Sequence, residues 1–195
     1  MALKRIVVVQ AHPDRAGHRL CHALGETYAA AAREAGHEVA VIDLAALDVP
    51  LLSSQAEFEH QPIPESLRPA SESILAADHM VFVFPLWLGT LPALLKAFLE
   101  QLLRPGIAFR YRERGMPERL LKGRSARLIV TMGMPVPVYR LYFGGHGLKV
   151  ISRSMLGFCG VAPVRETLFG MVETAGAKTR EKWFRKMRAL GARGA

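Results

Sequence analysis

The sequence contains little cysteine. Its two cysteines, Cys21 and Cys159, lie 138 positions apart, and neither belongs to a C-x-x-C or similar pair. Disulfide frameworks and zinc sites use closely spaced cysteine or histidine pairs. We therefore expect two buried thiols, which pack as small hydrophobic groups, and no metal site.

Long hydrophobic runs are also missing. No apolar run approaches the roughly 18 residues that a membrane-spanning helix needs. The opening M-A-L-K-R-I-V-V-V-Q places a charge before an apolar run, but this run is too short for a signal peptide and continues into an expected core strand. We expect a cytoplasmic protein.

Two nucleotide-binding motifs are absent as well. The first strand-like run is followed by A-H-P-D-R-A-G-H-R-L. This stretch is neither the dinucleotide fingerprint G-x-G-x-x-G nor the phosphate-binding loop G-x-x-x-x-G-K-[ST]. Both of those nucleotide sites are therefore excluded at this position.

The bulk composition indicates one globular domain over residues 1–195. Half of the residues are hydrophobic and 22% are charged, which is typical of a folded chain with a full-sized core. Short buried strands alternate with helices along the chain. Strands are expected at residues 4–10, 37–44, 79–84, 127–132 and 164–169. Helices are expected at residues 17–35, 65–77, 92–103, 148–158 and 178–190. Residues 45–70 are expected to form a long irregular connection.

This alternation predicts an α/β fold, a doubly wound five-stranded parallel sheet in a three-layer sandwich. Ligands in such folds bind beyond the carboxyl ends of the strands, at the topological switch point. The loops that follow the strands should therefore carry the chemistry.

Charge is distributed unevenly. Residues 1–103 carry 7 basic and 12 acidic side chains, whereas residues 104–195 carry 19 and 5. The basic half is explained equally well by a solvated surface and by contact with an anionic membrane, partner or ligand. A nucleic acid is not an expected partner, because the basic stretches lack interleaved aromatic residues and no recognition motif is present.

Basic groups gather at the start of the first helix. His18 and Arg19 lie in its opening turn, with His12 and Arg15 just before. The amino end of a helix is positive and disfavours cations. A bound phosphate between these groups and the helix amides would explain the pattern; the alternative is that the side chains point into solvent.

Two further loops follow the third and fourth strands. The first is F-P-L-W-L-G-T-L-P-A-L-L-K, in which Trp87 could line a flat ligand or belong to the core. The second is T-M-G-M-P-V-P-V-Y-R-L-Y-F-G-G-H-G, which we expect to be irregular.

Together the three loops resemble the flavodoxin-like NAD(P)H:quinone oxidoreductase family, which includes ancillary flavoproteins of potassium-efflux systems. The first loop is similar to the family's A-H-(P/S)-x-x-x-S-x-N-x, the second to its F-P-L-x-W-x-x-x-P-A-x-L-K, and the third to its T-x-G-G…Y…H-G. The similarity covers residues 4–190. Gly17 and Arg19 replace the family's serine and asparagine.

The resemblance implies a role for each matching position. The flavin phosphate would be surrounded by His12, Gly17, His18 and Arg19. The isoalloxazine ring would be contacted by Pro85, Leu86, Trp87 and Leu88 on one side, and by Thr131, Met132, Gly133 and Met134 on the other. Tyr139 and His146 would lie beside the reacting end of the flavin and act in catalysis.

The resemblance also implies an activity. The chain would transfer two electrons from NAD(P)H through FMN or FAD to a quinone or a similar acceptor. The alternative is a flavin-binding regulatory subunit of a membrane-associated potassium-efflux system, with little turnover. We also expect a homodimer, because one small domain has few places to bury the apolar side chains of Leu47, Val49, Leu51, Leu52, Phe58 and Ile63.

Overall fold

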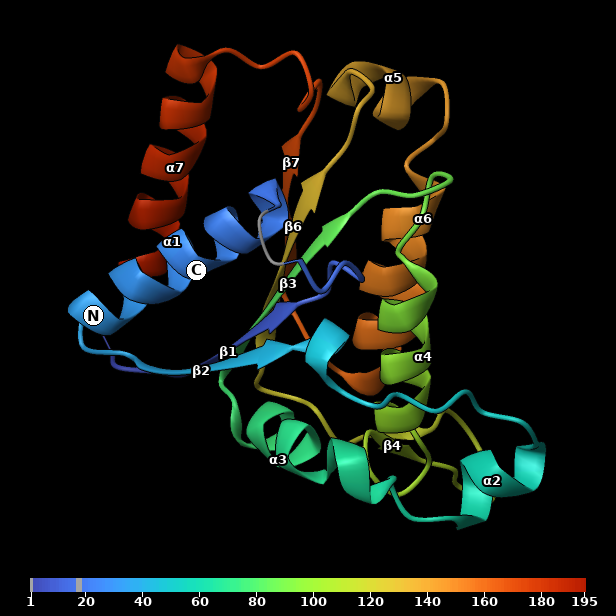
Figure 1. Ribbon diagram of the computed structural model, residues 1–195. Helices are drawn as coiled ribbons and strands as arrows, with labels where there is room; N and C mark the ends of the chain where they lie inside the picture. The colour runs from blue at the N-terminus through green and yellow to red at the C-terminus, as the bar shows by residue number, and fades with distance from the viewer. Residues whose placement is uncertain (1, 17–18) are drawn as a thin grey trace.

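The computed structural model describes residues 2–16 and 19–195. Five parallel strands form the central sheet in the order β2-β1-β3-β6-β7 (Figure 1). They are β1 (Arg5–Gln10), β2 (Glu38–Asp43), β3 (His79–Pro85), β6 (Ser125–Thr131) and β7 (Val164–Phe169). The predicted doubly wound, five-stranded parallel sheet is confirmed.

Alternating side chains of the strands feed two cores. On β1, Val7 and Val9 join the larger core, whereas Ile6 and Val8 join the smaller core on the opposite face. Every residue of β3 is buried. These continuous apolar runs form strands because both faces of the sheet are covered by helices.

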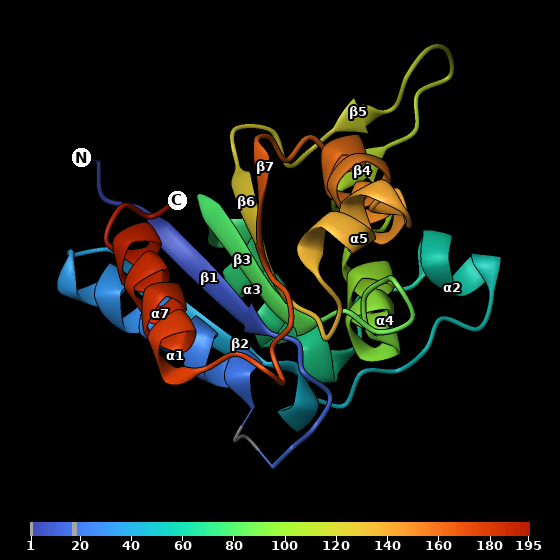
Figure 2. The ribbon, with the colours of Figure 1, turned by 90° about the horizontal axis from the view of Figure 1, so that it is seen from above.

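The helices form the two outer layers (Figures 1 and 2). One layer consists of α1 (Leu20–Glu34) and α7 (Ala177–Gly191). The other layer contains α3 (Arg68–Ala76), α4 (Ala93–Leu102), α6 (His146–Lys149) and the π-helix Val150–Gly157. The helix predicted at residues 148–158 is therefore present, but most of it has π rather than α geometry. No helix within the described ranges is long and apolar enough to cross a bilayer.

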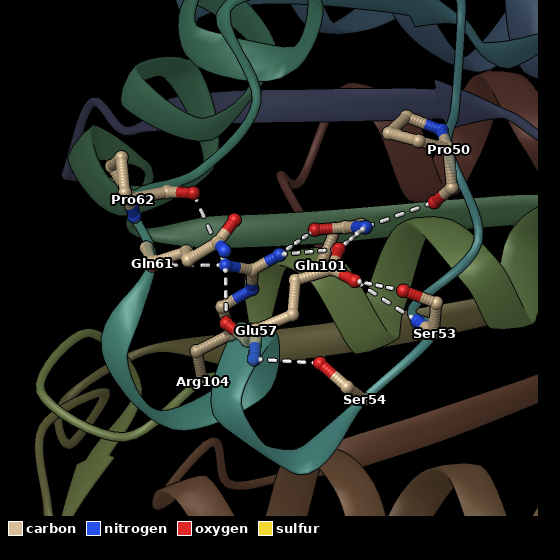
Figure 3. Close-up of polar contacts among 8 residues, drawn as sticks. All are labelled: Pro50, Ser53, Ser54, Glu57, Gln61, Pro62, Gln101 and Arg104. Atoms are coloured by element: carbon tan, nitrogen blue, oxygen red, sulfur yellow. Dashed lines mark hydrogen bonds and ion pairs between the residues drawn. The ribbon is translucent and has the colours of Figure 1, made fainter.

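Residues 45–70 are more ordered than expected. They contain α2 (Gln55–His60) and the 3-10 turns Leu44–Ala46 and Glu65–Leu67. Arg104, only 1% exposed, holds this segment by donating hydrogen bonds to the carbonyls of Glu57, Gln61 and Pro62 at 3.2, 2.9 and 3.1 Å (Figure 3). The Gln101 side chain bonds to Arg104 and to the Pro50 carbonyl. A long connection is ordered here because its backbone carbonyls have buried donors.

The sequence did not predict three further short elements. Helix α5 (Val136–Leu141) lies in the loop after β6, where we expected irregular structure because of its prolines. Pro137 lies in the first turn of α5, where its missing N–H costs no hydrogen bond. Strands β4 (Phe109–Arg110) and β5 (Glu118–Arg119) form a small antiparallel ribbon, and two-residue strands leave no periodic pattern in the sequence.

Candidate functional site

The three loops that follow β1, β3 and β6 meet at one edge of the sheet. The chain winds outward in opposite directions from β1 and β3, so the switch point lies between them. Backbone hydrogen bonds continue past the strand ends, from Ala11 N to Val83 O and from Leu86 N to Thr131 O, both at 2.8 Å. The loops therefore start from fixed and adjacent positions.

The loop after β1 contains a carboxylate, that of Asp14, which accepts hydrogen bonds from the same loop. Asp14 Oδ1 accepts a hydrogen bond from the Ala16 amide at 2.9 Å. Asp14 Oδ2 accepts one from Arg19 Nε at 2.7 Å and a second from the same guanidinium group. The Ala16 amide and then Arg19 lower the pKa of the Asp14 carboxyl group. Backbone and guanidinium donors of this kind also bind a phosphate, so the donor set fits an anionic ligand.

Arg19 is the N-cap residue of α1, and the first turn of this helix contains no acidic residue. The Asp14 carboxylate thus supplies the negative charge that the basic helix start lacked in our sequence analysis. Sequence reasoning missed Asp14, although an acidic residue five positions before Arg19 was a readable signal.

His12 connects this loop to the next one. Its Nδ1 accepts a hydrogen bond from the Asp14 amide at 3.1 Å. Burial and the neighbouring His22 lower the pKa of His12, so the neutral ring carries its proton on Nε2. The His12 ring centre lies 5.9 Å from that of Trp87 in an edge-on arrangement and 5.5 Å from that of His22. His22, buried on α1, is a second neighbour that the sequence analysis did not identify.

The loop after β3 makes a tight turn. Trp87 and Thr90 exchange two backbone hydrogen bonds of 3.0 Å, and the two central residues, Leu88 and Gly89, have φ angles of 47° and 78°. Two positive φ angles are the signature of a type I′ turn. Trp87 is 48% exposed and Leu88 is fully exposed, so Trp87 belongs to the rim of the site and not to the core. Pro85 is buried, and Leu86 packs against the core.

The loop after β6 presents mainly backbone. Thr131 and Met132 are buried, Gly133 is exposed, and Met134 packs against the core. The Thr131 hydroxyl lies 3.1 Å from the Cys21 thiol, and burial raises the pKa of that thiol to about 11. Side chains of Thr131 and Met132 are therefore placed to support the site from below, while the backbone at Gly133 is accessible.

Tyr139 and His146 have different surroundings. Tyr139 is 1% exposed, and its hydroxyl donates to the Gly89 carbonyl at 3.2 Å and accepts from the Leu148 amide at 3.2 Å. These two contacts occupy the hydroxyl of Tyr139 as a donor and as an acceptor. His146 is exposed at the first position of α6, and no hydrogen bond among the described residues joins it to Tyr139.

The structure thus brings His12, Arg19, Trp87 and Leu88 to one edge and keeps the hydroxyl of Tyr139 beneath it. Gly17 and His18, which we predicted beside a phosphate, lie outside the described residues. The remaining predicted positions, at 85–86 and 131–134, form the strand ends and the supporting loop.

Several known proteins are similar to this chain. A family model described as a flavodoxin-like fold matches residues 4–190. An uncharacterized NAD(P)H oxidoreductase of Haemophilus influenzae is 27% identical over 192 residues, which is 90% of this chain and 94% of the relative. An FMN-dependent NADH:quinone oxidoreductase of Yersinia enterocolitica is 30% identical over 138 residues, 60% of this chain and 68% of the relative.

A solved structure is similar over the whole chain. The NAD(P)H:quinone oxidoreductase from Methanothermobacter marburgensis aligns with a TM-score of 0.81 and 26% sequence identity, covering 100% of both chains. Since the family model spans nearly all of the sequence, this chain belongs to the family with the flavodoxin-like fold.

Proposed function

We propose that this protein is a flavin-dependent NAD(P)H oxidoreductase that uses FMN and passes two electrons to a quinone or a similar small acceptor. The observation that carries the proposal is the meeting of the Asp14–Arg19 loop with the Trp87 turn at the switch point of the sheet. The relatives support the choice of FMN over FAD, because several of them are named as FMN-dependent.

The loop after β1 would hold the phosphate. Arg19 and the Ala16 amide already donate to a carboxylate, and a phosphate offers them the same kind of acceptor. His12 contributes the N–H of its Nε2. Gly17 and His18 remain predicted phosphate neighbours.

The other two loops would hold the ring. Trp87 and Leu88 present apolar surface at the rim, with Pro85 and Leu86 behind them. The segment 131–134 would approach the ring from the opposite side, with its backbone at Gly133. When bound, the flavin supplies the hydride chemistry; the chain orients it and limits its contact with water.

His146 is the group we propose for moving a proton. Its side chain is exposed, so it can reach an acceptor that enters from solvent, and a ring nitrogen of imidazole can donate a hydrogen bond. It would donate a hydrogen bond or a proton to the oxygen of the acceptor as negative charge develops there.

A homodimer remains our proposal for the assembly, with a corrected basis. The chain's own core is contacted by four of these side chains, Leu47, Val49, Phe58 and Ile63. The apolar surface left for a partner to cover is therefore smaller than we expected. What supports the proposal is an apolar cavity of about 520 Å³ between the segment around α2, α4 and the π-helix, with Leu52, Phe58, Leu99 and Leu103 in its wall. Sedimentation equilibrium giving only a 21.5 kDa species at micromolar concentration would refute it.

We further propose the cytoplasm as the compartment, because both cysteines are free thiols and reduced thiols are usual there. A membrane-associated partner would be a regulatory addition to this enzyme, and the basic side chains of residues 104–195 are the candidate contact.

The direct test is anaerobic mixing of the FMN-loaded protein with NADH and, separately, with NADPH. Either nucleotide should bleach the flavin absorption band, and a quinone should restore it. A flavin-bound protein that neither nucleotide reduces would instead support the regulatory alternative. Absence of any flavin binding would overturn both functions.

A further inference from the structure

We infer that Tyr139 is a positioning residue that holds the Trp87–Thr90 turn in its strained conformation, and that it does not transfer a proton in the reaction. The inference rests on the proposed function only for its effect on flavin. The contacts that carry it lie within the chain itself.

The turn needs external support. Leu88 adopts a φ angle of 47°, a left-handed conformation that costs an aliphatic side chain about 1–2 kcal/mol. Its side chain is fully exposed, so burial of Leu88 does not offset that cost. Such a conformation persists only where the surroundings determine it.

The segment 139–148 provides that support. The Tyr139 hydroxyl donates to the carbonyl of Gly89, the second central residue of the turn, and accepts from the amide of Leu148 in α6. One buried hydroxyl therefore joins the loop after β3 to the helices after β6. Burial raises the pKa of Tyr139, which keeps the hydroxyl protonated and able to donate.

A backbone contact reinforces the same junction. A Cβ atom at Gly147 would overlap the Gly89 carbonyl oxygen and would lie 2.7 Å from the Thr90 Cα atom. The backbone of α6 thus lies directly against the turn, and any larger residue at 147 would push the turn outward. Tyr139 and Gly147 act on the same carbonyl from two positions.

The consequence concerns the flavin ring. The turn carries Trp87 and Leu88, which we propose to contact the ring, while the phosphate is held by another loop. Loosening the turn should therefore weaken FMN and riboflavin equally, since both contain the ring. It should leave the pH dependence of flavin reduction unchanged, because no titrating donor is lost.

The experiment compares Tyr139→Phe with Tyr142→Phe. Tyr142 lies three residues later and is 82% exposed, so it is a matched control for the loss of a phenolic hydroxyl. In Tyr139→Phe we expect the affinities for FMN and riboflavin to fall alike, by about three- to tenfold, the range for one net hydrogen bond. At saturating flavin the rate of reduction and its pH profile should equal those of the parent. Tyr142→Phe should match the parent throughout.

A double-mutant cycle tests the route through the turn. Leu88→Asn places Asn-Gly at the centre of the turn, the most favoured type I′ pair, so the turn would hold itself. In this background Tyr139→Phe should weaken flavin binding by less than twofold, which is the non-additivity expected of coupled residues. An equal loss in both backgrounds would contradict the inference.

Hydrogen exchange of the Leu148 amide gives a readout without flavin. This amide donates to the Tyr139 hydroxyl, so Tyr139→Phe should speed its exchange. The measurement tests the contact between Tyr139 and Leu148 even in a protein that binds no flavin. Unchanged exchange would overturn the positioning role of Tyr139. A slower flavin reduction with unchanged flavin affinity would instead make the hydroxyl a catalytic donor.

Discussion

Arg19 and Arg104 carry the same guanidinium group in two different surroundings. Arg19 lies at the carboxyl edge of the sheet, is exposed, and bonds to the single carboxylate of Asp14. Arg104 lies beneath α2, is buried, and bonds to three backbone carbonyls. A ligand can replace the partner of Arg19, whereas no ligand can replace the partners of Arg104 without unfolding the segment.

Two histidines repeat this difference. His146 is exposed at the carboxyl edge. His79 is buried at the opposite end of β3, where its Nδ1 lies 2.8 Å from the Ser125 hydroxyl. Burial, with Lys4, Arg127 and Arg165 nearby, lowers the pKa of His79 to about 3. In both pairs, the residue at the carboxyl edge is exposed and available to a ligand, whereas the buried residue holds the fold.

The largest expected effect is the loss of stability when Arg104 is replaced. Arg104→Met keeps the length of the side chain but removes the donors to the carbonyls around α2. We expect the free energy of unfolding to fall by about 3–5 kcal/mol, the range for breaking a buried charged network. Urea unfolding measures it. Lys96→Gln is the control: it removes an exposed pair with Glu100 and should change stability by about 0.5 kcal/mol or less. Similar losses in both variants would erase the distinction between the two kinds of site.

Replacing the exposed histidine should change the rate and not the fold. In His146→Gln we expect flavin-dependent quinone reduction to slow by about tenfold to a thousandfold, with flavin affinity unchanged. Steady-state rates and flavin titration measure the two quantities. His60→Gln, at the exposed end of α2, is the matched control and should behave as the parent. Equal rates in all three proteins would remove His146 from the mechanism.

The buried histidine should appear in the pH dependence of stability. The unfolded chain binds a proton at His79 below about pH 6.5, whereas the folded chain does so only near pH 3. Between these values the unfolded state binds more protons, so stability falls as the pH falls. The contribution of one such group is at most about 1.4 kcal/mol per pH unit.

His79→Gln should remove that slope. Urea unfolding at pH 6.5, 5.5 and 4.5 would compare it with the parent, and the difference between the two curves isolates His79 from other titrating groups. Parallel curves would show that the His79 ring is not held neutral by the fold.

The sequence predicted the sheet because long buried runs such as residues 79–84 have only one stable placement in an α/β fold. It did not predict α5, where prolines suggested a loop, or α2, whose order depends on Arg104 nearly fifty positions later. At the site, the sequence shows only that Trp87 follows β3 and that Tyr139 follows β6. Whether a side chain faces the rim or the interior depends on tertiary contacts, such as that of Tyr139 with Gly89, which no local pattern contains.

The most direct test of the proposed phosphate site is the ratio of riboflavin to FMN affinity in the parent and in Arg19→Ala. If Arg19 holds the phosphate, the variant should weaken FMN by about 1–3 kcal/mol, as for a hydrogen bond to a charged group. Riboflavin, which has no phosphate, should bind both proteins alike, and thermal melts without flavin should agree because the Asp14–Arg19 pair is exposed. An equal loss for riboflavin and FMN would contradict the assignment of the phosphate to the loop after β1.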